Sequence, residues 1–574
     1  MLRPVSAHEV TAVERPQRGG PRISRAIIAV AVGAVVVVAT IALAFGASAV
    51  TGPATSAAAL PAPRFVEEAL AAGIEHAYEG EYTFFVGGGV AAFDCDGDRR
   101  PELYFAGGSA PAALFRNRTE TGGALRFERA ADPVTDLTSV TGAYPLDIDG
   151  DRLVDLVVLR RGENMVLRGL GECRFEHANQ ALGMAGGEAW TVGFSATWET
   201  PTATLPTLAF GDYVTLDERE SAVGCPDNQL IRPTDSGTVY AAPVALSPGW
   251  CTLSLLFSDW DRSGRRDLRV SNDRHYYQDG EEQLWRIEPG QPPREYRRDD
   301  GWARLQVWGM GIASQDLTGD GYPEVYLTSQ GDNKLQTLAD GPARPSFEDI
   351  ALRRGVTAHR PFAGGDVLPS TAWHAEFDDV NADGYMDLFV AKGNVEAQTE
   401  YATKDPNNLL IGQPDGTFVE GAEAAGLLGF AKARGATLTD LDLDGMLDLV
   451  VVNRRENVMV WRNVGSGTAA APVAMGGWIQ VRLSQDGPNP DAIGSWVDVK
   501  VGDLTTAREL TVGGGHASGE LGWMHAGLGS ADRAEVRVRW PDGEQGPWLP
   551  LEARRFGIIE RGATAITPWS PSPP

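Results

Sequence analysis

The sequence is short of positive charge, histidine and catalytic motifs, and each shortage narrows what the chain can do. Lysine and arginine number 50 against 77 aspartates and glutamates, which gives a formal net charge of −27. Nucleic-acid binding needs a cationic surface, so we expect no such partner. Metalloprotease, nucleophile-elbow, phosphate-loop and complete dinucleotide-binding motifs are missing, and the eight histidines are scattered. We therefore expect a protein that is not an enzyme.

Cysteine is scarce as well, and no two cysteines have the C-x-x-C spacing of a zinc knuckle or a redox pair. An even number of cysteines in an exported chain suggests two disulfides. Three pairings of Cys95, Cys173, Cys225 and Cys251 are possible. We favour Cys95–Cys173 with Cys225–Cys251, because the last two lie close in sequence. Four buried thiols are the alternative.

Charge is absent from residues 26–50, an apolar stretch that arginines precede. As a helix it would be about 37 Å long, enough to cross a bilayer. The arginines favour a cytoplasmic tail over 1–24, a transmembrane signal anchor over 25–50, and a linker over 51–64 before an extracellular bulk. Cleavage after the small residues 47–49 would instead make the protein secreted.

Six short segments carry the same arrangement of oxygen-bearing side chains, at positions 1, 3, 5 and 9, directly before an apolar run. Alternate side chains of a tight turn can point at one centre, and Ca²⁺ takes about six to eight oxygen ligands, so we expect up to six structural calcium sites. The expected ligands, turn by turn, are Asp94, Asp96, Asp98 and Glu102; Asp147, Asp149, Asp151 and Asp155; Asp259, Asp261, Ser263 and Asp267; Asp316, Thr318, Asp320 and Glu324; Asp379, Asn381, Asp383 and Asp387; and Asp440, Asp442, Asp444 and Asp448.

These six segments, the acidic turns, differ from an EF-hand. An EF-hand needs a glutamate at position 12 and flanking helices, whereas apolar residues stand there in strand-like runs. Glycine at position 6, as in Gly384 and Gly445, allows a sharp bend, and the first turn has Arg99 instead. Mg²⁺ is less suited because it keeps several waters. Solvated turns without metal are the alternative.

The acidic turns recur at a period that predicts repeats. Successive turns start 53, 112, 57, 63 and 61 residues apart, and the double gap implies a hidden copy near residue 200. Aligning Leu208 with the apolar residue after position 9 places Glu199 at position 1 and Thr207 at position 9. Seven strand-rich units then predict an all-β fold, with a seven-bladed β-propeller over 65–466. Six or eight blades remain possible. We expect the stretch from Tyr82 to close the ring.

The remaining sequence predicts a second, smaller β domain. Segments such as "WIQVRL" and "AEVRVRW" alternate apolar and polar residues, which favours a small sandwich or barrel over 476–562. We expect a linker over 467–475 and a disordered tail over 563–574. His516 and His525 are interpreted as surface or locally hydrogen-bonded residues, since no third metal ligand stands near them.

The acidic turns resemble the FG-GAP/VCBS repeats of integrin α-subunit propellers and of bacterial extracellular proteins. "NNLLIGQPDGTFVEGAEAAGL" resembles the inter-blade segment of cartilage acidic protein-like chains, and "GGWIQVRLSQDGPNPDAIGSWVDVKVG" with "RELTVGGGHASGELGWMHAGLG" resembles the ASPIC/UnbV domain. The resemblance implies a calcium-binding extracellular propeller followed by a small β domain, and it implies no reaction.

Together these features predict a membrane-anchored, calcium-stabilised propeller for adhesion or for recognition of an extracellular protein or glycan. The alternative is a secreted polysaccharide-acting enzyme or an accessory protein of secondary metabolism. His374 could line a central funnel, although a packed histidine between blades is the simpler interpretation. The long stretch from Asp212 to Cys251 is the candidate partner-facing loop, with a disulfide-pinned decoration as the alternative.

Overall fold

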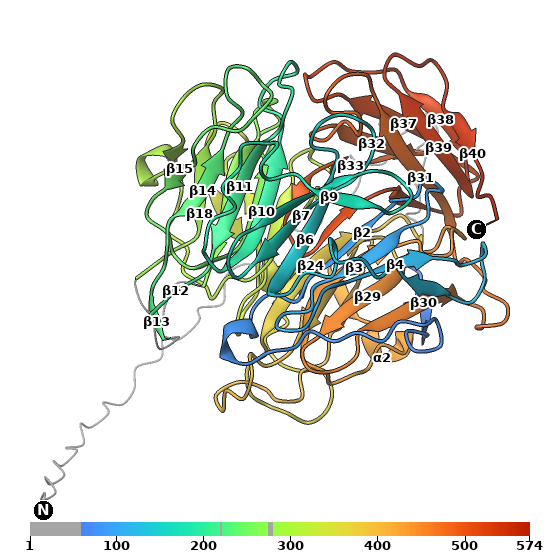
Figure 1. Ribbon diagram of the computed structural model, residues 1–574. Helices are drawn as coiled ribbons and strands as arrows, with labels where there is room; N and C mark the ends of the chain where they lie inside the picture. Colours follow the sequence, from blue (N-terminus) through green and yellow to red (C-terminus); the bar gives the residue numbers. More distant parts are fainter. Residues whose placement is uncertain (1–58, 218–220, 274–278, 574) are drawn as a thin grey trace, which may run out of the picture. The chain divides into compact units, whose positions relative to one another are not determined.

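A computed structural model of the chain describes residues 59–217, 221–273 and 279–573 (Figure 1). The expectation of an all-β protein is confirmed, because the four helices in these residues span only three or four residues each: η1 (Tyr82–Phe84), η2 (Arg298–Asp300), α1 (Ala351–Arg354) and α2 (Ala422–Ala425). None of the described helices is long and apolar enough to span a bilayer. The predicted tail over 1–24 and anchor over 25–50 lie outside the described residues.

Seven four-stranded antiparallel units follow one another in the described chain. The first four consist of β2 (Val90–Phe93), β3 (Glu102–Phe105), β4 (Ala113–Asn117) and β5 (Phe127–Arg129); β6 (Val140–Leu146), β7 (Asp155–Arg160), β8 (Met165–Gly169) and β9 (Phe175–His177); β10 (Thr191–Thr197), β11 (Thr207–Asp212), β14 (Asn228–Ile231) and β15 (Val244–Leu246); and β16 (Thr252–Ser258), β17 (Asp267–Asn272), β18 (Gln283–Arg286) and β19 (Arg294–Glu295).

The other three units consist of β20 (Ile312–Gln315), β21 (Glu324–Leu327), β22 (Lys334–Leu338) and β23 (Phe347–Asp349); β24 (Ala372–Asp378), β25 (Asp387–Lys392), β26 (Asn408–Gly412) and β27 (Phe418–Glu420); and β28 (Ala433–Thr439), β29 (Asp448–Asn453), β30 (Met459–Gly465) and β1 (Arg64–Glu67). In each unit the first strand contacts the first strand of the next unit, and β28 contacts β2. The units therefore form a closed series.

The strand that completes the seventh unit comes from the beginning of the described chain. β1 pairs with β30, with Phe65 opposite Asn463, and the Phe65 side chain packs near Trp461. The expectation that the stretch from Tyr82 closes the ring is therefore wrong. Tyr82–Phe84 forms the short helix η1, and the strand after it, β2, is the first strand of the first unit.

The inner strands are almost entirely buried, and β20 and β24 each contain one half-buried residue. All seven residues of β6, β10, β16 and β28 are buried. Both faces of each sheet pack against a neighbouring sheet, so these strands read as continuous apolar or small-residue runs rather than as an alternating pattern. Each acidic turn directly follows such an inner strand.

Residues after the ring form two further four-stranded sheets, which share one core. Their orders are β36-β31-β39-β40 and β33-β32-β37-β38, made of β31 (Gly477–Ser484), β32 (Trp496–Val501), β33 (Leu504–Glu509), β36 (Met524–Gly529), β37 (Arg533–Arg539), β38 (Leu549–Glu552), β39 (Arg555–Glu560) and β40 (Thr567–Trp569). The tail expected to be disordered over 563–574 instead contains β40. It is ordered because Trp569 packs against Trp523 and Phe556.

Both favoured disulfides are present, Cys95–Cys173 and Cys225–Cys251. The interpretation of residues 212–251 as a long partner-facing loop is wrong for most of the stretch. β14 and β15 within it are the third and fourth strands of the third unit. The excursion is the hairpin of β12 (Thr215–Leu216) and β13 (Ala222–Gly224), which ends at the disulfide.

Candidate functional site

All six acidic turns share one backbone geometry, centred on position 6. The backbone there has a positive φ, including 67° at Arg99 and 71° at Arg152, where the sequence has no glycine. In each turn the N–H of position 6 donates to the carboxylate of position 1, as from Gly445 to Asp440 at 2.8 Å. Position 1 therefore fixes the bend in addition to offering a ligand oxygen.

Position 9 has a structural role that the sequence pattern did not reveal. In the sixth turn one oxygen of Asp448 accepts from the N–H of Leu441 at 2.9 Å, and the other accepts from Asn463 at 2.7 Å. Asp155 makes the same two kinds of bond, to Ile148 within the turn and to Gly169 on the third strand. The carboxylate at position 9 therefore ties the turn to its own sheet.

Three of the acidic turns bring their carboxylates together. Ligand oxygens of positions 1, 3 and 9 lie within 4.8 Å of one another in the first, second and sixth turns, from Asp94, Asp96 and Glu102, from Asp147, Asp149 and Asp155, and from Asp440, Asp442 and Asp448. Burial raises the pKa of Asp147 to about 7 and that of Asp155 to about 8, and it raises those of Asp440, Asp442 and Asp448 well above their usual range. A cation would relieve this crowding.

The sixth turn has the strongest indication of a ligand. Both carboxylate oxygens of Asp442 are buried and accept no hydrogen bond within the described part of the protein, and the residue has no exposed surface. The nearest cationic atom, Nη1 of Arg462, lies 3.9 Å away. An unsatisfied buried carboxylate is costly, so the site fits a hard cation such as Ca²⁺.

The third acidic turn already contains a cation of its own chain. Nε of Arg265 lies 2.9 Å from Asp267, and Nη2 lies 3.4 Å from Asp261. Trp260 and Tyr296 also donate to Asp267. The guanidinium group thus lies beside two of the four expected ligands of this turn.

The turn of the hidden copy near residue 200 also pairs its acid with an arginine. It lies between β10 and β11, as its spacing predicts. Glu199 accepts hydrogen bonds from Thr207 at 2.7 Å and from Arg232 at 2.6 Å. Arginine thus compensates the single acid of this turn.

The fourth and fifth turns satisfy part of their ligand set internally. Thr318 donates to Glu324 at 3.4 Å, and Asn381 donates to Asp383 at 3.2 Å. The N–H of Leu60 also donates to Asp383. Their acids do not form a close group like those of the other three turns within the described residues.

A segment of the C-terminal domain enters the ring. Residues 508–524, the axial segment, contain β34 (Val512–Gly513), which bridges β10 and β16, and β35 (Gly519–Leu521), which pairs with β2. Two glycines of the inner strands make room for it, since a Cβ would lie 1.7 Å from the Ala517 carbonyl oxygen at Gly89 and 2.3 Å from it at Gly142.

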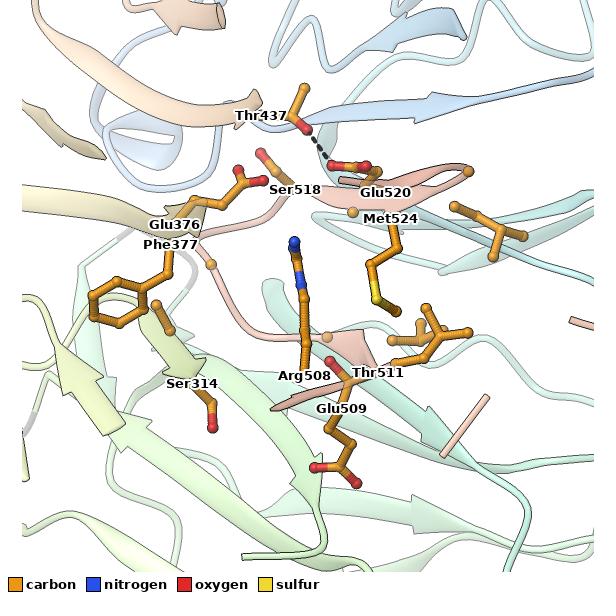
Figure 2. A pocket seen from close by; sticks show the side chains of 18 of the residues that line it. Ser314, Glu376, Phe377, Thr437, Arg508, Glu509, Thr511, Ser518, Glu520 and Met524 are labelled. Atoms are coloured by element: carbon orange, nitrogen blue, oxygen red, sulfur yellow. Dashed lines mark hydrogen bonds between the residues drawn. The ribbon is translucent and has the colours of Figure 1, made fainter. Parts of the chain in front are cut away.

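Beside the axial segment lies a cavity of about 160 Å³, the axial cavity, which Figure 2 shows. Arg508 points into the space between Glu376 of β24 and Glu520 of β35 (Figure 2). Thr437 donates a hydrogen bond to Glu520 at 3.1 Å, and the N–H of Leu438 donates to Glu376 at 3.1 Å. Arg508 forms an ion pair with Asp378, to which His525 also bonds at 3.2 Å.

The three histidines of interest are buried and hydrogen-bonded, as the simpler interpretation expected. His374 accepts from the N–H of His516 at 3.0 Å, and the ring of His516 bonds to the Met310 carbonyl and accepts from the N–H of Gly87. Burial lowers the pKa of both rings to about 3, so both are neutral. His374 also lines the axial cavity.

A second cavity, the aromatic pocket, lies at the other end of the inner strands. Its wall residues precede a first strand, lie at the start of one (Trp373 in β24) or follow a second strand, whereas the acidic turns follow the first strands. Six of the seven units contribute to it, so it lies where the units converge. Its volume is about 460 Å³ and its lining includes Tyr82, Phe85, Tyr213, Met310, Trp373 and Val395.

Charged groups surround the apolar floor of the aromatic pocket. Glu396 forms ion pairs with Arg454 and with Arg455, the latter at 3.1 Å. Tyr213 donates to Asp273 at 2.8 Å. Apolar walls with a few convergent polar groups are typical of ligand sites. The sequence did not indicate this pocket, because its residues are dispersed over almost 400 positions.

Comparison with known proteins gives two family matches. Residues 379–451 match the model of an FG-GAP-like repeat, and residues 485–565 match the model named ASPIC and UnbV. No curated protein matches. The first match spans the fifth and sixth acidic turns, and the second spans β32 to β39.

Solved structures are similar at low identity. BBS1N in complex with ARL6DN is 10% identical over 66% of this chain and 93% of that chain, with a TM-score of 0.39. AofleA from Arthrobotrys oligospora is 11% identical over 59% of this chain and 86% of that chain, with a TM-score of 0.33. The extracellular domain of the hybrid two-component system BT4673 from B. thetaiotaomicron is 10% identical over 88% of this chain and 60% of that chain, with a TM-score of 0.38.

Proposed function

We propose that this chain, which matches the models of an FG-GAP-like repeat and of an ASPIC and UnbV domain, is an extracellular recognition protein built on a seven-bladed β-propeller. The closed series of contacts between the first strands of the seven units supports the propeller. The proposed recognition role rests on the aromatic pocket, to which six units contribute. Two disulfides support an extracellular location.

We further propose that residues 25–50 anchor the protein in the cell membrane, with the propeller outside. The apolar length of this stretch and the arginines before it support the anchor. Retention of the stretch would keep the recognition face at the cell surface, whereas cleavage near residues 47–49 would release it.

Calcium is proposed as the stabilising ion of the acidic turns. The first, second and sixth turns would hold it through the carboxylates that converge there, whereas the acids of the fourth and fifth turns would have to move closer together to do so. Bound Ca²⁺ would neutralise the crowded carboxylates and fix each turn to its sheet. The third turn is the exception, because Arg265 already lies between its carboxylates.

The aromatic pocket favours a protein partner over a glycan. Its lining is partly apolar, from Phe85, Met310 and Val395, and it also carries both signs of charge, from Glu396 and the more exposed Arg455. A partner's aromatic or aliphatic side chain can fill such a pocket while polar groups around it pair with the rim, which is the usual arrangement of an interface hot spot. A sugar would need more hydrogen-bond partners on the floor.

Panning of a random peptide library displayed on phage tests this role. Peptides selected on the wild-type protein are expected to share an aromatic or aliphatic residue and to lose at least about tenfold in affinity for Tyr82→Ala/Phe85→Ala, since an anchor in a pocket contributes about 2 kcal/mol or more. Phe430→Ala is the control, because Phe430 is 41% exposed and lies outside the pocket.

Two results would contradict the proposal. One is a set of peptides whose binding is unchanged by Tyr82→Ala/Phe85→Ala. The other is strong binding on a glycan array that requires Tyr82 and Phe85, with no peptide selected. The second result would keep the pocket as the recognition site and replace the protein partner with a carbohydrate.

A further inference from the structure

The axial cavity contains one arginine and two glutamates that form no ion pair with one another. Arg508 enters from β33, Glu376 from β24 and Glu520 from β35 (Figure 2). No ion pair within 4.0 Å joins Arg508 to either glutamate among the residues described. The guanidinium group and the two carboxylates therefore face one another across open space.

Carboxyl groups also outnumber cationic groups around the cavity. Asp378 pairs with Arg508 and so neutralises the one cation there. His374, 3.3 Å from Glu376, is a neutral ring and offers no charge. Glu376 and Glu520 have no positive partner within 4.0 Å among the described residues, and both are half-buried. Burial raises the pKa of both carboxyl groups, so each favours its protonated form until a cation is near. A ligand that brings a positive charge would complete the cavity.

Size limits what this ligand can be. A protein cavity of about 150 Å³ holds a molecule as large as benzene, so about 160 Å³ exceeds the space that one ion needs and suits about five to seven heavy atoms. Hydroxyl groups of Ser314, Thr437, Thr511 and Ser518 line the same space and suit a polar molecule. Arg508 beside the two glutamates disfavours a divalent metal ion.

We propose that the axial cavity binds a small primary amine that also carries an oxygen acceptor. Its ammonium group lies between the carboxylates of Glu376 and Glu520, and its oxygen accepts from the N–H donors of Arg508 that Asp378 does not use. Free α-amino acids of the size of alanine and amino alcohols of the size of ethanolamine share this chemistry. The site is separate from the aromatic pocket, so either can fail without the other.

Titration calorimetry on the full chain tests the proposal, with four probes. Alanine and ethanolamine contain both groups, propionate lacks the ammonium group, and methylammonium lacks the oxygen acceptor. Alanine or ethanolamine is expected to bind at least about tenfold more tightly than both single-group probes. The better of the two identifies whether the acceptor is a carboxylate or a hydroxyl.

Variants assign the binding to the cavity. Glu520→Gln is expected to lower the affinity at least about tenfold, and Glu552→Gln, on the exposed surface of β38, is expected to leave it unchanged. If Glu520→Gln does not fold, Thr437→Val removes the hydrogen bond to Glu520 while leaving the charge in place, and weaker binding is again expected. Absence of binding by every probe at 10 mM, or equal binding by Glu520→Gln, would overturn the proposal and leave a cavity filled with water.

Discussion

Single residues distinguish the six similar acidic turns from one another. Asp442 accepts no hydrogen bond among the described residues and has only Arg462 at 3.9 Å, whereas the corresponding Asp261 already faces Arg265 at 3.4 Å. Position 3 looks alike in the sequence of both turns. The sequence therefore predicted the ligand pattern and its period, but it could not show how each oxygen is satisfied. In the hidden copy, for example, Arg232 reaches Glu199 from 33 positions away.

Glu376 gives a prediction at the residue scale for the dependence of stability on pH. Burial raises its pKa from an ordinary 4.5 to about 8, and it faces His374, Asp378, Arg508 and Glu520. The folded state holds this proton more tightly than the unfolded state does, so stability falls as the pH rises from about 4.5 to about 8.

The variant Glu376→Gln removes this titration and is expected to flatten that part of the profile. At pH 8 it should melt about 2 °C higher than the wild-type protein, and at pH 4.5 the difference should vanish. Melting curves by circular dichroism at pH 4.5, 6 and 8, with no amine added, measure both values. A variant that melts lower at pH 8 would contradict the assignment of an uncompensated charge.

At the scale of elements, the sequence pattern predicted the strands that follow the acidic turns, but it did not predict every strand pairing. The apolar runs after position 9 correctly predicted the second strands, such as β7 and β29. The prediction for ring closure was wrong because β1 has an ordinary sequence, and only its pairing with β30 shows its role. Two strands that pair across such a long separation in the chain leave no signal of that pairing in their local sequences.

Calcium removal is the corresponding test for the acidic turns. The wild-type protein is expected to melt lower in EDTA than in calcium, since each occupied site adds about 2.7 kcal/mol when the ion is at a hundred times its dissociation constant. Asp442→Asn is expected to melt higher than the wild type in EDTA, because it removes a buried carboxylate that accepts no hydrogen bond, and to gain less from calcium.

The matched control is Asp261→Asn in the third turn, where Arg265 already occupies the centre. It is expected to leave the number of bound calcium ions unchanged, as measured by elemental analysis after dialysis. Identical melting of the wild type with and without EDTA would refute calcium stabilisation, and loss of one ion in Asp261→Asn would refute the role given to Arg265.

At the scale of the whole described molecule, the ring and the C-terminal domain act as one structure. The axial segment pairs with β2, β10 and β16, and its His516 packs against Trp373 in the wall of the aromatic pocket. The sequence predicted two successive domains with a linker between them. It could not predict the insertion, because the segment's signals are three glycines and two short strands.

Gly89→Ala tests this insertion, because its Cβ would lie 1.7 Å from the Ala517 carbonyl oxygen. The variant is expected to lose about 1–3 kcal/mol of stability and to show faster hydrogen exchange at residues 512–519. Gly522→Ala is the control within the segment, since no atom lies within 4 Å of its added Cβ. Unchanged exchange in Gly89→Ala would show that the segment does not depend on this close approach.

The pairing of β1 with β30 also constrains how the protein is made. Glu68, next to β1, forms an ion pair with Arg462 of β30, and 394 positions separate the two. A ribosome must therefore synthesise nearly the entire ring before its first strand finds a partner. Until then the growing chain exposes a free sheet edge on each side, which is a site for pairing with the wrong neighbour. Export of this protein should thus depend on helper proteins that shield those edges during synthesis.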